Sequence, residues 1–409
     1  MRVAYYSPLP PERSGIADYS ALLLPALAER IDLEVVERGR RRPPRGTDLA
    51  VYHVGNSPDA HGWILEALRR RPGVVVLHEF VLHHLIAGTT LGKGDSDAYL
   101  RAMERDAGLA GRLLAYGVLD GSLPPLWAVR PEDFPLAGEV LDLASEHGLI
   151  VHSEHVTERA RAAGFSGRIW RIPMAAWPEP RAEPSAVEGE PVIGSFGFLN
   201  ANKRIPQLLE AFALLRQRQP NARLLLVGPE APGLDVERRV ERLQLQGAVE
   251  HHGYVDEERL WSLVAACDVC VSLRFPTMGE TSAGVIRVLP MAKPLVVSDA
   301  DAFRELPNEV ALKIAVDVNE VESLAAALVL LAENAEQRAA MSEAARAYVA
   351  REHELSRVAE LYAAALEEAA GGDAVREAVL GEVARAAADV GFDDAERLGA
   401  AAREIGLGG

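Results

Sequence analysis

The chain has few of the residues that mark secreted or membrane-spanning proteins. Two of its 409 residues are cysteines, too few for the disulfide framework of a small secreted domain. No apolar run approaches the ~20 residues of a membrane-spanning helix, and the opening MRVAYYSPLPP lacks a signal-peptide pattern. We therefore expect a cytoplasmic protein that at most touches the inner face of the membrane.

The two cysteines form a CxxC pattern in the apolar run CDVCVSL, at Cys267 and Cys270. On a β-strand, residues i and i+3 point to opposite faces of the sheet. We therefore expect two thiols that cannot share a metal ion. Buried strand cysteines in a reducing compartment are a better interpretation than a redox pair.

Lysine is also scarce, and acidic residues are in excess. The 43 Lys and Arg residues face 60 Asp and Glu, and the net charge of −17 argues against a general nucleic-acid binder. Only four of the basic residues are lysines, so each lysine hints at a need for a compact point charge. Hydrophobic residues (49%) and charged residues (25%) have the proportions of a soluble globular protein.

Short β-branched runs alternate with amphipathic segments in the first half of the chain. This alternation predicts parallel strands covered by helices on both faces. The predicted strands are 3–7, 33–37, 49–55, 74–78 and 149–153, and the predicted helices include 17–30, 59–71, 97–117 and 155–164.

The pattern stops at the Pro- and Glu-rich WPEPRAEPSAVEGEP and then restarts. We predict an α/β fold with two doubly wound, Rossmann-like domains that face each other across a cleft, where ligands bind at the carboxyl ends of the strands. The predicted parts are domains over 1–176 and 192–352, a linker over 177–191, a closing helix over 353–371 and a tail over 372–409, expected to form a helical hairpin.

The stretch GETSAGVIRVLP follows a predicted strand and begins a predicted helix. Thr281 or Ser282 is a suitable N-cap. The amides of Ala283 and its neighbours are then unpaired at the positive end of the helix dipole, a suitable place for phosphate. Gly284 would allow a ligand to approach the backbone, and Glu280 supplies a carboxylate. The alternative is an ordinary capped helix with Glu280 in solvent.

Three further residues are candidates because each stands where a strand or loop leads into a helix. Lys203 follows the strand VIGSFGF, where a lysine can meet phosphate oxygens. Gly15 begins a helix after the first strand, and His78 ends the fourth strand, where a histidine facing the cleft is a catalytic or sugar-binding candidate. The alternative for Lys203 is a solvated surface lysine.

Taken in order, six segments resemble the family 4 (group 1) retaining glycosyltransferases of the GT-B fold, in a variant with a GETS-type donor motif. The resemblance covers residues 1 to about 370. The segments are SGIADYS, VHSEHVTERARAAGF, GFLNANKRIPQLLEAFALL, ARLLLVGPE, HHGYVDEERLWSLVAACDVCVSLRFP and GETSAGVIRVLPMAKPLVVSD.

The resemblance implies transfer of a sugar from a nucleotide-diphosphate sugar to an acceptor hydroxyl, with retention of configuration and without a metal or other cofactor. It places the donor on the C-terminal domain, and a sugar, polysaccharide or lipid-linked acceptor on the N-terminal domain. Glu280 would contact the transferred sugar, and Lys203 would neutralise the diphosphate. The nucleotide would be bound largely through backbone around Gly228, Pro229, Tyr254 and Val255.

The sequence departs from the family pattern at two positions. Phe198 stands where an arginine usually precedes the lysine by five residues, and Arg287 stands where a second glutamate usually holds the ribose. Arg287 is therefore expected to supply the missing phosphate charge. These departures keep open a non-catalytic partner subunit of the same fold, and a nucleotide-sugar 2-epimerase is a weaker alternative because its motifs do not match.

Overall fold

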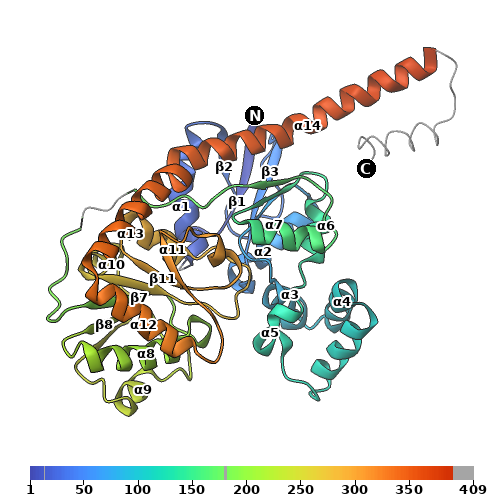
Figure 1. Ribbon diagram of the computed structural model, residues 1–409. Helices are drawn as coiled ribbons and strands as arrows, with labels where there is room; N and C mark the ends of the chain where they lie inside the picture. Colours follow the sequence, from blue (N-terminus) through green and yellow to red (C-terminus); the bar gives the residue numbers. More distant parts are fainter. Residues whose placement is uncertain (13, 179–181, 390–409) are drawn as a thin grey trace.

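The computed structural model of the chain describes residues 1–12, 14–178 and 182–389 and consists of two α/β domains (Figure 1). Each domain has one parallel six-stranded sheet. The predicted fold class, with two doubly wound domains, is therefore confirmed. Within the described residues, no helix combines the length and the apolar composition that crossing a membrane requires.

The N-terminal sheet has the order β2-β1-β3-β4-β5-β6. Its strands are β1 (Arg2–Tyr6), β2 (Asp32–Val35), β3 (Leu49–Val54), β4 (Val74–Leu77), β5 (Leu149–Val151) and β6 (Ile169–Arg171). The helices are α1 (Gly15–Ala28), α2 (Pro58–Arg70), α3 (His83–Thr90), α4 (Ser96–Leu119), α5 (Leu126–Val129), α6 (Gly138–Ala144) and α7 (Glu154–Ala162), with 3-10 turns η1 (Leu91–Lys93) and η2 (Pro131–Asp133).

The C-terminal sheet has the order β12-β11-β10-β7-β8-β9. Its strands are β7 (Val192–Phe196), β8 (Arg223–Val227), β9 (Val249–His252), β10 (Val269–Ser272), β11 (Leu295–Ser298) and β12 (Ala311–Ile314). The helices are α8 (Ile205–Arg218), α9 (Val236–Arg242), α10 (Glu257–Ala266), α11 (Ala283–Val288), α12 (Glu320–Glu333) and α13 (Ala335–Tyr348), with short helical turns η3 (Ala201–Lys203), η4 (Leu289–Met291), η5 (Asp301–Glu305) and η6 (Val349–His353).

The strand orders locate the crevices where such sheets bind ligands. In the C-terminal sheet, β7 lies between β8 and β10, so the chain leaves β7 in one direction and returns on its other side. The loops after β7 and β10 therefore diverge and leave a crevice at the carboxyl ends of these strands. The corresponding point of the N-terminal sheet lies between β1 and β3.

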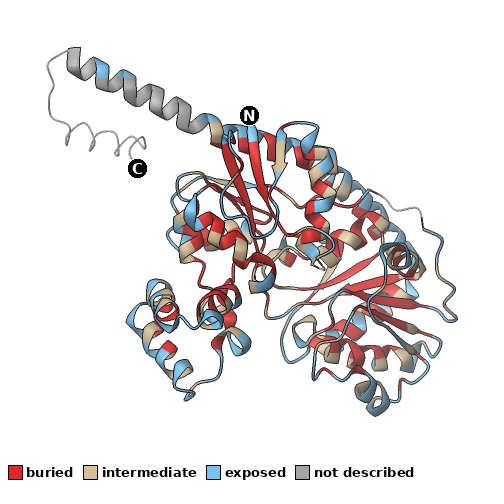
Figure 2. Ribbon diagram, turned by 180° about the vertical axis from the view of Figure 1, so that it is seen from behind, coloured by how far each residue is buried: buried red, intermediate tan, exposed pale blue. Residues whose placement is uncertain are grey.

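Local sequence signals set the helix starts around these crevices. Ser14, Ser57, Ser153 and Ser282 each accept a hydrogen bond from the amide three residues further on, as N-caps do. The inner strands are apolar because helices cover both faces, and every residue of β3 is buried. Figure 2 shows this burial in the middle of both sheets.

The last helix, α14 (Leu355–Asp389), leaves the C-terminal domain and packs along the N-terminal domain (Figure 1). Tyr362 receives a hydrogen bond from Tyr19 at 3.3 Å, and Glu368 accepts one from the Trp170 indole at 2.6 Å. The helix continues through Gly371 to Asp389, so the expected hairpin does not begin at the glycine pair. Residues 390–409 of the expected tail lie outside the described part.

The expectation of two buried cysteines is confirmed, but the expectation that both lie on one strand and point to opposite faces is wrong. Both are buried and free, but Cys267 precedes β10, so the alternation of a strand does not apply to the pair. A hydrogen bond with Cys270, together with burial, raises the pKa of the Cys267 thiol well above its usual value. The two side chains therefore lie together in the core.

Candidate functional site

Lys203 is folded back over the end of β7. Its Nζ donates a hydrogen bond to the Phe196 carbonyl at 2.5 Å. Gly197 has φ +99°, and a Cβ at that position would lie 2.5 Å from Nζ. Glycine is therefore required at 197 for two reasons: it adopts the positive φ of the turn, and it has no Cβ to collide with the lysine side chain.

The environment of Lys203 lowers the pKa of its ammonium group. Burial is the main cause and the Arg274 guanidinium is the second, while the Glu280 carboxylate acts in the opposite direction, and together they lower the pKa of Lys203 to about 7. An ammonium next to a second cation is stabilised by an incoming anion. The site can therefore attract phosphate oxygens and take up a proton as it binds them.

Arg274 is the second cation of the crevice. It follows β10 by two residues, and its amide donates to Ser298 Oγ at 2.9 Å. Its Nε lies 3.1 Å from Glu280 Oε1, and the two side chains are only 20% and 14% exposed. The other Glu280 oxygen, Oε2, accepts the Met278 amide at 2.6 Å. The carboxylate is therefore held from both sides.

The helix start predicted at the GETS stretch is confirmed. Ser282 Oγ accepts the Val285 amide at 3.4 Å, and α11 begins at Ala283. A Cβ on Gly284 would lie 3.5 Å from the Phe196 carbonyl, which places this glycine beside the end of β7. Thr281 lines a small pocket next to Glu280, between the two domains. Lys203 and the GETS stretch are thus brought to one crevice.

The N-terminal domain contacts the C-terminal domain directly at this crevice. The Val81 amide donates to the Met278 carbonyl at 2.9 Å. A Cβ on Gly279 would lie 2.9 Å from Phe80 Cβ. A Cβ on Gly15, at the start of α1, would lie 3.3 Å from Ala283 Cβ. Gly15 therefore faces α11 across the domain boundary, as expected for a residue of the cleft.

His78 directly follows β4, close to the strand end where it was predicted, but its ring points into the N-terminal domain. It is 5% exposed, and its Nε2 lies 2.9 Å from Nδ1 of His53. Tyr19 and His152 pack against the ring. Burial and the neighbouring imidazole of His152 lower its pKa well below the usual value. A neutral, buried imidazole of this kind packs the domain, and its direct role in the cleft stays a prediction.

Arg287 lies on the domain boundary and is already paired. Its guanidinium donates to Asp18 Oδ2 of α1 at 2.5 Å and lies 4.4 Å from the centre of the Trp177 ring. Burial raises the pKa of Asp18, and Arg287 counteracts this shift. The pairing favours a role in domain contact over the expected phosphate contact, and Arg274 has the better position for the missing charge.

This pairing leads to a test with the variants Arg287→Ala and Asp18→Asn. We expect each to lower Tm by roughly 1–3 °C and the double variant to lower it no further than the larger single effect. Thermal unfolding measures stability, and titration with nucleoside diphosphates measures phosphate binding. If Arg287 bound phosphate instead, Arg287→Ala would weaken nucleoside-diphosphate binding and Asp18→Asn would not.

The predicted nucleotide-binding residues lie at the ends of β8 and β9. Gly228 has φ +137°, and a Cβ there would collide with the Gly197 carbonyl. The Leu199 amide donates to the Pro229 carbonyl at 2.8 Å, so the loops after β7 and β8 are joined. Tyr254 is 63% exposed, and Val255 packs against the core. Gly228 and Pro229 therefore adjoin the Lys203 loop.

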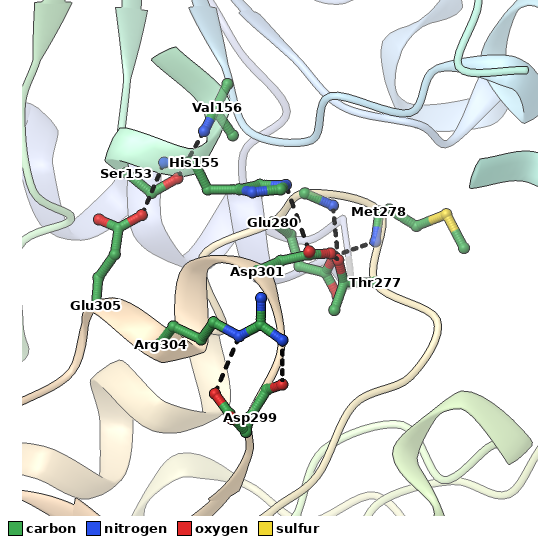
Figure 3. A network of polar contacts seen from close by, with 11 residues as sticks. Ser153, His155, Val156, Thr277, Met278, Glu280, Asp299, Asp301, Arg304 and Glu305 are labelled. Carbon is green, nitrogen blue, oxygen red and sulfur yellow. Dashed lines mark hydrogen bonds and ion pairs between the residues drawn. The ribbon is translucent and has the colours of Figure 1, made fainter. Parts of the chain in front are cut away.

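A polar network connects the two domains on the other side of Glu280 (Figure 3). Glu305 of η5 accepts the amides of Glu154 and His155 at 2.9 and 2.8 Å, at the start of α7. His155 Nε2 lies 3.8 Å from Asp301, which also accepts the Thr277 hydroxyl. A carboxylate at the amino end of a helix is stabilised by the free amides and the dipole. The network holds the loop that carries Glu280.

No sequence pattern singled out Arg274 or Glu305, and Glu79 was placed only at the end of a predicted strand, without a role. Arg274 and Glu79 each follow a buried strand by two residues, which is the one local signal that could have identified them. Glu305 has no such signal because its partners are more than a hundred residues away. Within the described ranges, no three His, Cys, Asp or Glu side chains come together in a way that could hold a metal ion.

The second half of the chain matches a known family. Residues 178–348 match the model of the family "Glycosyl transferases group 1". The phosphatidyl-myo-inositol mannosyltransferase of Mycolicibacterium smegmatis is 30% identical over 154 residues, which is 37% of this chain. This chain spans 38% of the length of that relative.

Two solved structures share the two-domain fold. HepE from Anabaena, in complex with UDP and glucose, has 17% identity and a TM-score of 0.60, over 90% of this chain and 100% of that chain. The sucrose-phosphate synthase of Thermosynechococcus elongatus has 18% identity and a TM-score of 0.61, over 88% and 96%. At these identities the likeness shows the fold alone, which is the GT-B arrangement.

Proposed function

We propose that the protein is a retaining glycosyltransferase that transfers a sugar from a nucleotide-diphosphate sugar to an acceptor hydroxyl. The observation that carries this proposal is the grouping of Lys203, Arg274 and Glu280 at the β7–β10 crevice. This grouping faces the N-terminal domain across the cleft, in a domain that matches the group 1 glycosyltransferases.

The diphosphate of the donor would bind at the end of β7. Lys203 Nζ and the Arg274 guanidinium supply two positive charges, and the amides at the start of α11 add donors beside Gly284. These groups stabilise the negative charge that develops on the leaving diphosphate. Because two side-chain cations can neutralise it, we propose that the reaction needs no metal ion or other cofactor.

The sugar would lie next to Glu280, between the domains. Cleavage of the bond to the diphosphate leaves positive charge on the sugar ring, and the Glu280 carboxylate stabilises that charge. The acceptor hydroxyl attacks from the face that the diphosphate leaves and gives its proton to the departing phosphate oxygen, which retains the configuration. Contact between residues 80–81 and 278–279 helps to exclude water, which would otherwise hydrolyse the donor.

The choice of donor and acceptor follows from what similar proteins bind. HepE is described with UDP and glucose, and the mannosyltransferase is named for an inositol lipid acceptor. We therefore propose a UDP-sugar as the first donor to test, and a sugar, polysaccharide or lipid-linked acceptor. We place the reaction in the cytoplasm, with the inner membrane face as the site of a lipid-linked acceptor.

Binding and donor hydrolysis test this function. A panel of nucleoside diphosphates and their sugars is screened by thermal shift, and the pairs that bind are incubated with the protein and EDTA. We expect Tm to rise by several degrees with at least one nucleotide, because a ligand that binds only the folded state stabilises it by mass action. Slow release of nucleoside diphosphate should persist in EDTA.

Two results would contradict the proposal. If no nucleotide shifts Tm, the donor site is wrong. If a nucleotide sugar binds but is not turned over with any acceptor, the chain is a non-catalytic partner subunit. NMR of the product anomeric proton decides between retention and inversion.

A further inference from the structure

Glu79 is a carboxyl group of the cleft that the proposed mechanism does not use. It stands two residues beyond β4, at the carboxyl end of the N-terminal sheet. Its side chain receives a hydrogen bond from the Asn56 amide, in the loop after β3. Glu79 is half-buried, and the Glu280 carboxylate and the Arg274 guanidinium of the C-terminal domain both act on its carboxyl group.

The backbone around Glu79 runs beside the loop that carries Glu280. The next residue, Phe80, has its Cβ 2.9 Å from where a Cβ on Gly279 would be. The Val81 amide is bonded to Met278. The Phe80 ring is itself covered by the Arg159 guanidinium at 4.6 Å. Glu79 is therefore held at the domain boundary, opposite Glu280, by contacts that do not involve its own carboxyl group.

The charges around Glu79 come from both domains. Glu280 and Arg274 of the C-terminal domain face it, and Lys203 stands behind them, beside Arg274. From its own domain, His78 is turned away toward His53, and Arg159 lies over Phe80. The Arg274 guanidinium, the cation that acts on Glu79, is already paired with Glu280. Burial and the Glu280 carboxylate raise the pKa of Glu79 to about 8, against the opposing effect of Arg274.

We propose that Glu79 binds a hydroxyl group of the transferred sugar, from the side opposite Glu280, as an uncharged carboxylic acid. In this form the group has one O–H donor and one carbonyl acceptor, which match a sugar hydroxyl that accepts and donates in turn. The carboxylate form has only acceptors and adds a second negative charge beside Glu280. This inference rests on the proposed function, because it requires a sugar between the domains.

The arrangement also specifies the class of sugar. A charged sugar, such as a uronic acid, would bring a third carboxylate to the space between Glu79 and Glu280. An uncharged hexose or similar polyol brings only hydroxyl groups. The cleft therefore favours a neutral sugar in the donor.

The test compares UDP-glucose with UDP, because their affinity ratio isolates the contribution of the sugar. Both are titrated calorimetrically between pH 6 and pH 9 with wild type, Glu79→Gln and a surface control, Glu29→Gln. For wild type and the control we expect the ratio to fall by roughly tenfold as pH rises through about 8, the size of one well-placed hydrogen bond. Glu79→Gln stays neutral, so its ratio should not change with pH.

The outcomes separate this inference from the proposed function. A ratio that is independent of pH in wild type, or that falls equally in Glu79→Gln, overturns the role of Glu79. Absence of UDP binding overturns the donor site, and with it the proposed function. If a UDP-linked uronic acid binds more tightly than UDP-glucose, the preference for a neutral sugar is overturned.

A second measurement does not depend on any ligand. The pKa of Glu79 is higher in the folded chain than the usual value of 4.5, so between these two values the folded state holds a proton that the unfolded state has lost. The free energy of unfolding then falls as pH rises from about 4.5 to about 8. In urea titrations, the free energy of unfolding of wild type and Glu29→Gln should show this fall with pH. In Glu79→Gln the slope should be smaller, by an amount that corresponds to at most one proton. Equal slopes in all three overturn the neutral state of Glu79.

Discussion

Replacing Lys203 by alanine is expected to weaken the binding of a nucleoside diphosphate by about 10- to 100-fold. Lys203 Nζ lies at the end of β7, within a crevice that also contains Arg274. A hydrogen bond to a charged group contributes about 1.5–3 kcal/mol, which is a factor of this size. The measurement is a calorimetric titration with UDP, and the control is Lys93→Ala, because Lys93 lies on the surface and pairs with Glu66.

The pKa of Lys203 also predicts how UDP binding depends on pH. Because its pKa is lowered to about 7, the free protein at pH 8 has mostly neutral Lys203, and a bound diphosphate should restore the charge. Wild type should therefore take up close to one proton per UDP at pH 8, and its affinity should fall as pH rises above 7. Titrations in two buffers of different ionisation enthalpy measure the uptake. Undiminished UDP affinity in Lys203→Ala, or equal proton uptake in that variant, would show that the lysine is not a phosphate ligand.

Replacing Glu280 by glutamine is expected to reduce turnover by about 100- to 1,000-fold. The carboxylate stabilises positive charge that exists on the sugar only in the transition state, and removing one such group typically has an effect of this size. The affinity for UDP should change by less than about threefold, because UDP carries no sugar at this position. Release of UDP from UDP-glucose measures the first quantity, and calorimetry measures the second.

The ion pair of Glu280 with Arg274 requires a control. Glu280→Gln leaves the guanidinium without its carboxylate, so part of any loss could come from a displaced Arg274. Arg274→Lys keeps the positive charge but removes the planar guanidinium, which can donate two parallel hydrogen bonds. This variant should weaken UDP binding more than it slows turnover of bound donor. Turnover by Glu280→Gln within tenfold of wild type would refute the role of this carboxylate.

Much of the fold could be predicted because its signals are local. Alternation of buried strands and amphipathic helices identified the two α/β domains, and Ser282 identified the start of α11. Boundaries were close, with the strand predicted over 49–55 found at Leu49–Val54. Lys203 could be selected because it follows a strand of the predicted sheet, where such folds bind ligands.

The missed features depend on residues that are far apart in the sequence. Arg287 pairs with Asp18, 269 positions away, and no local pattern distinguishes this pair from a phosphate contact. His78 lies one residue beyond the end of β4, close to its predicted place, but packing against His53 decides where its ring points. Cys267 lies two residues before β10, at the end of α10, so the alternation of a strand does not separate the two thiols.

The sequence alone therefore determined the elements, their order and the strand ends where ligands would bind, because hydrophobic periodicity and helix caps act within a few residues. Only the tertiary structure decided which charges meet. It placed Arg274 beside Lys203, paired it with Glu280 and set Glu79 opposite them across the domain boundary. Electrostatic interactions depend on distance and burial in space, and neither is a property of position along the chain.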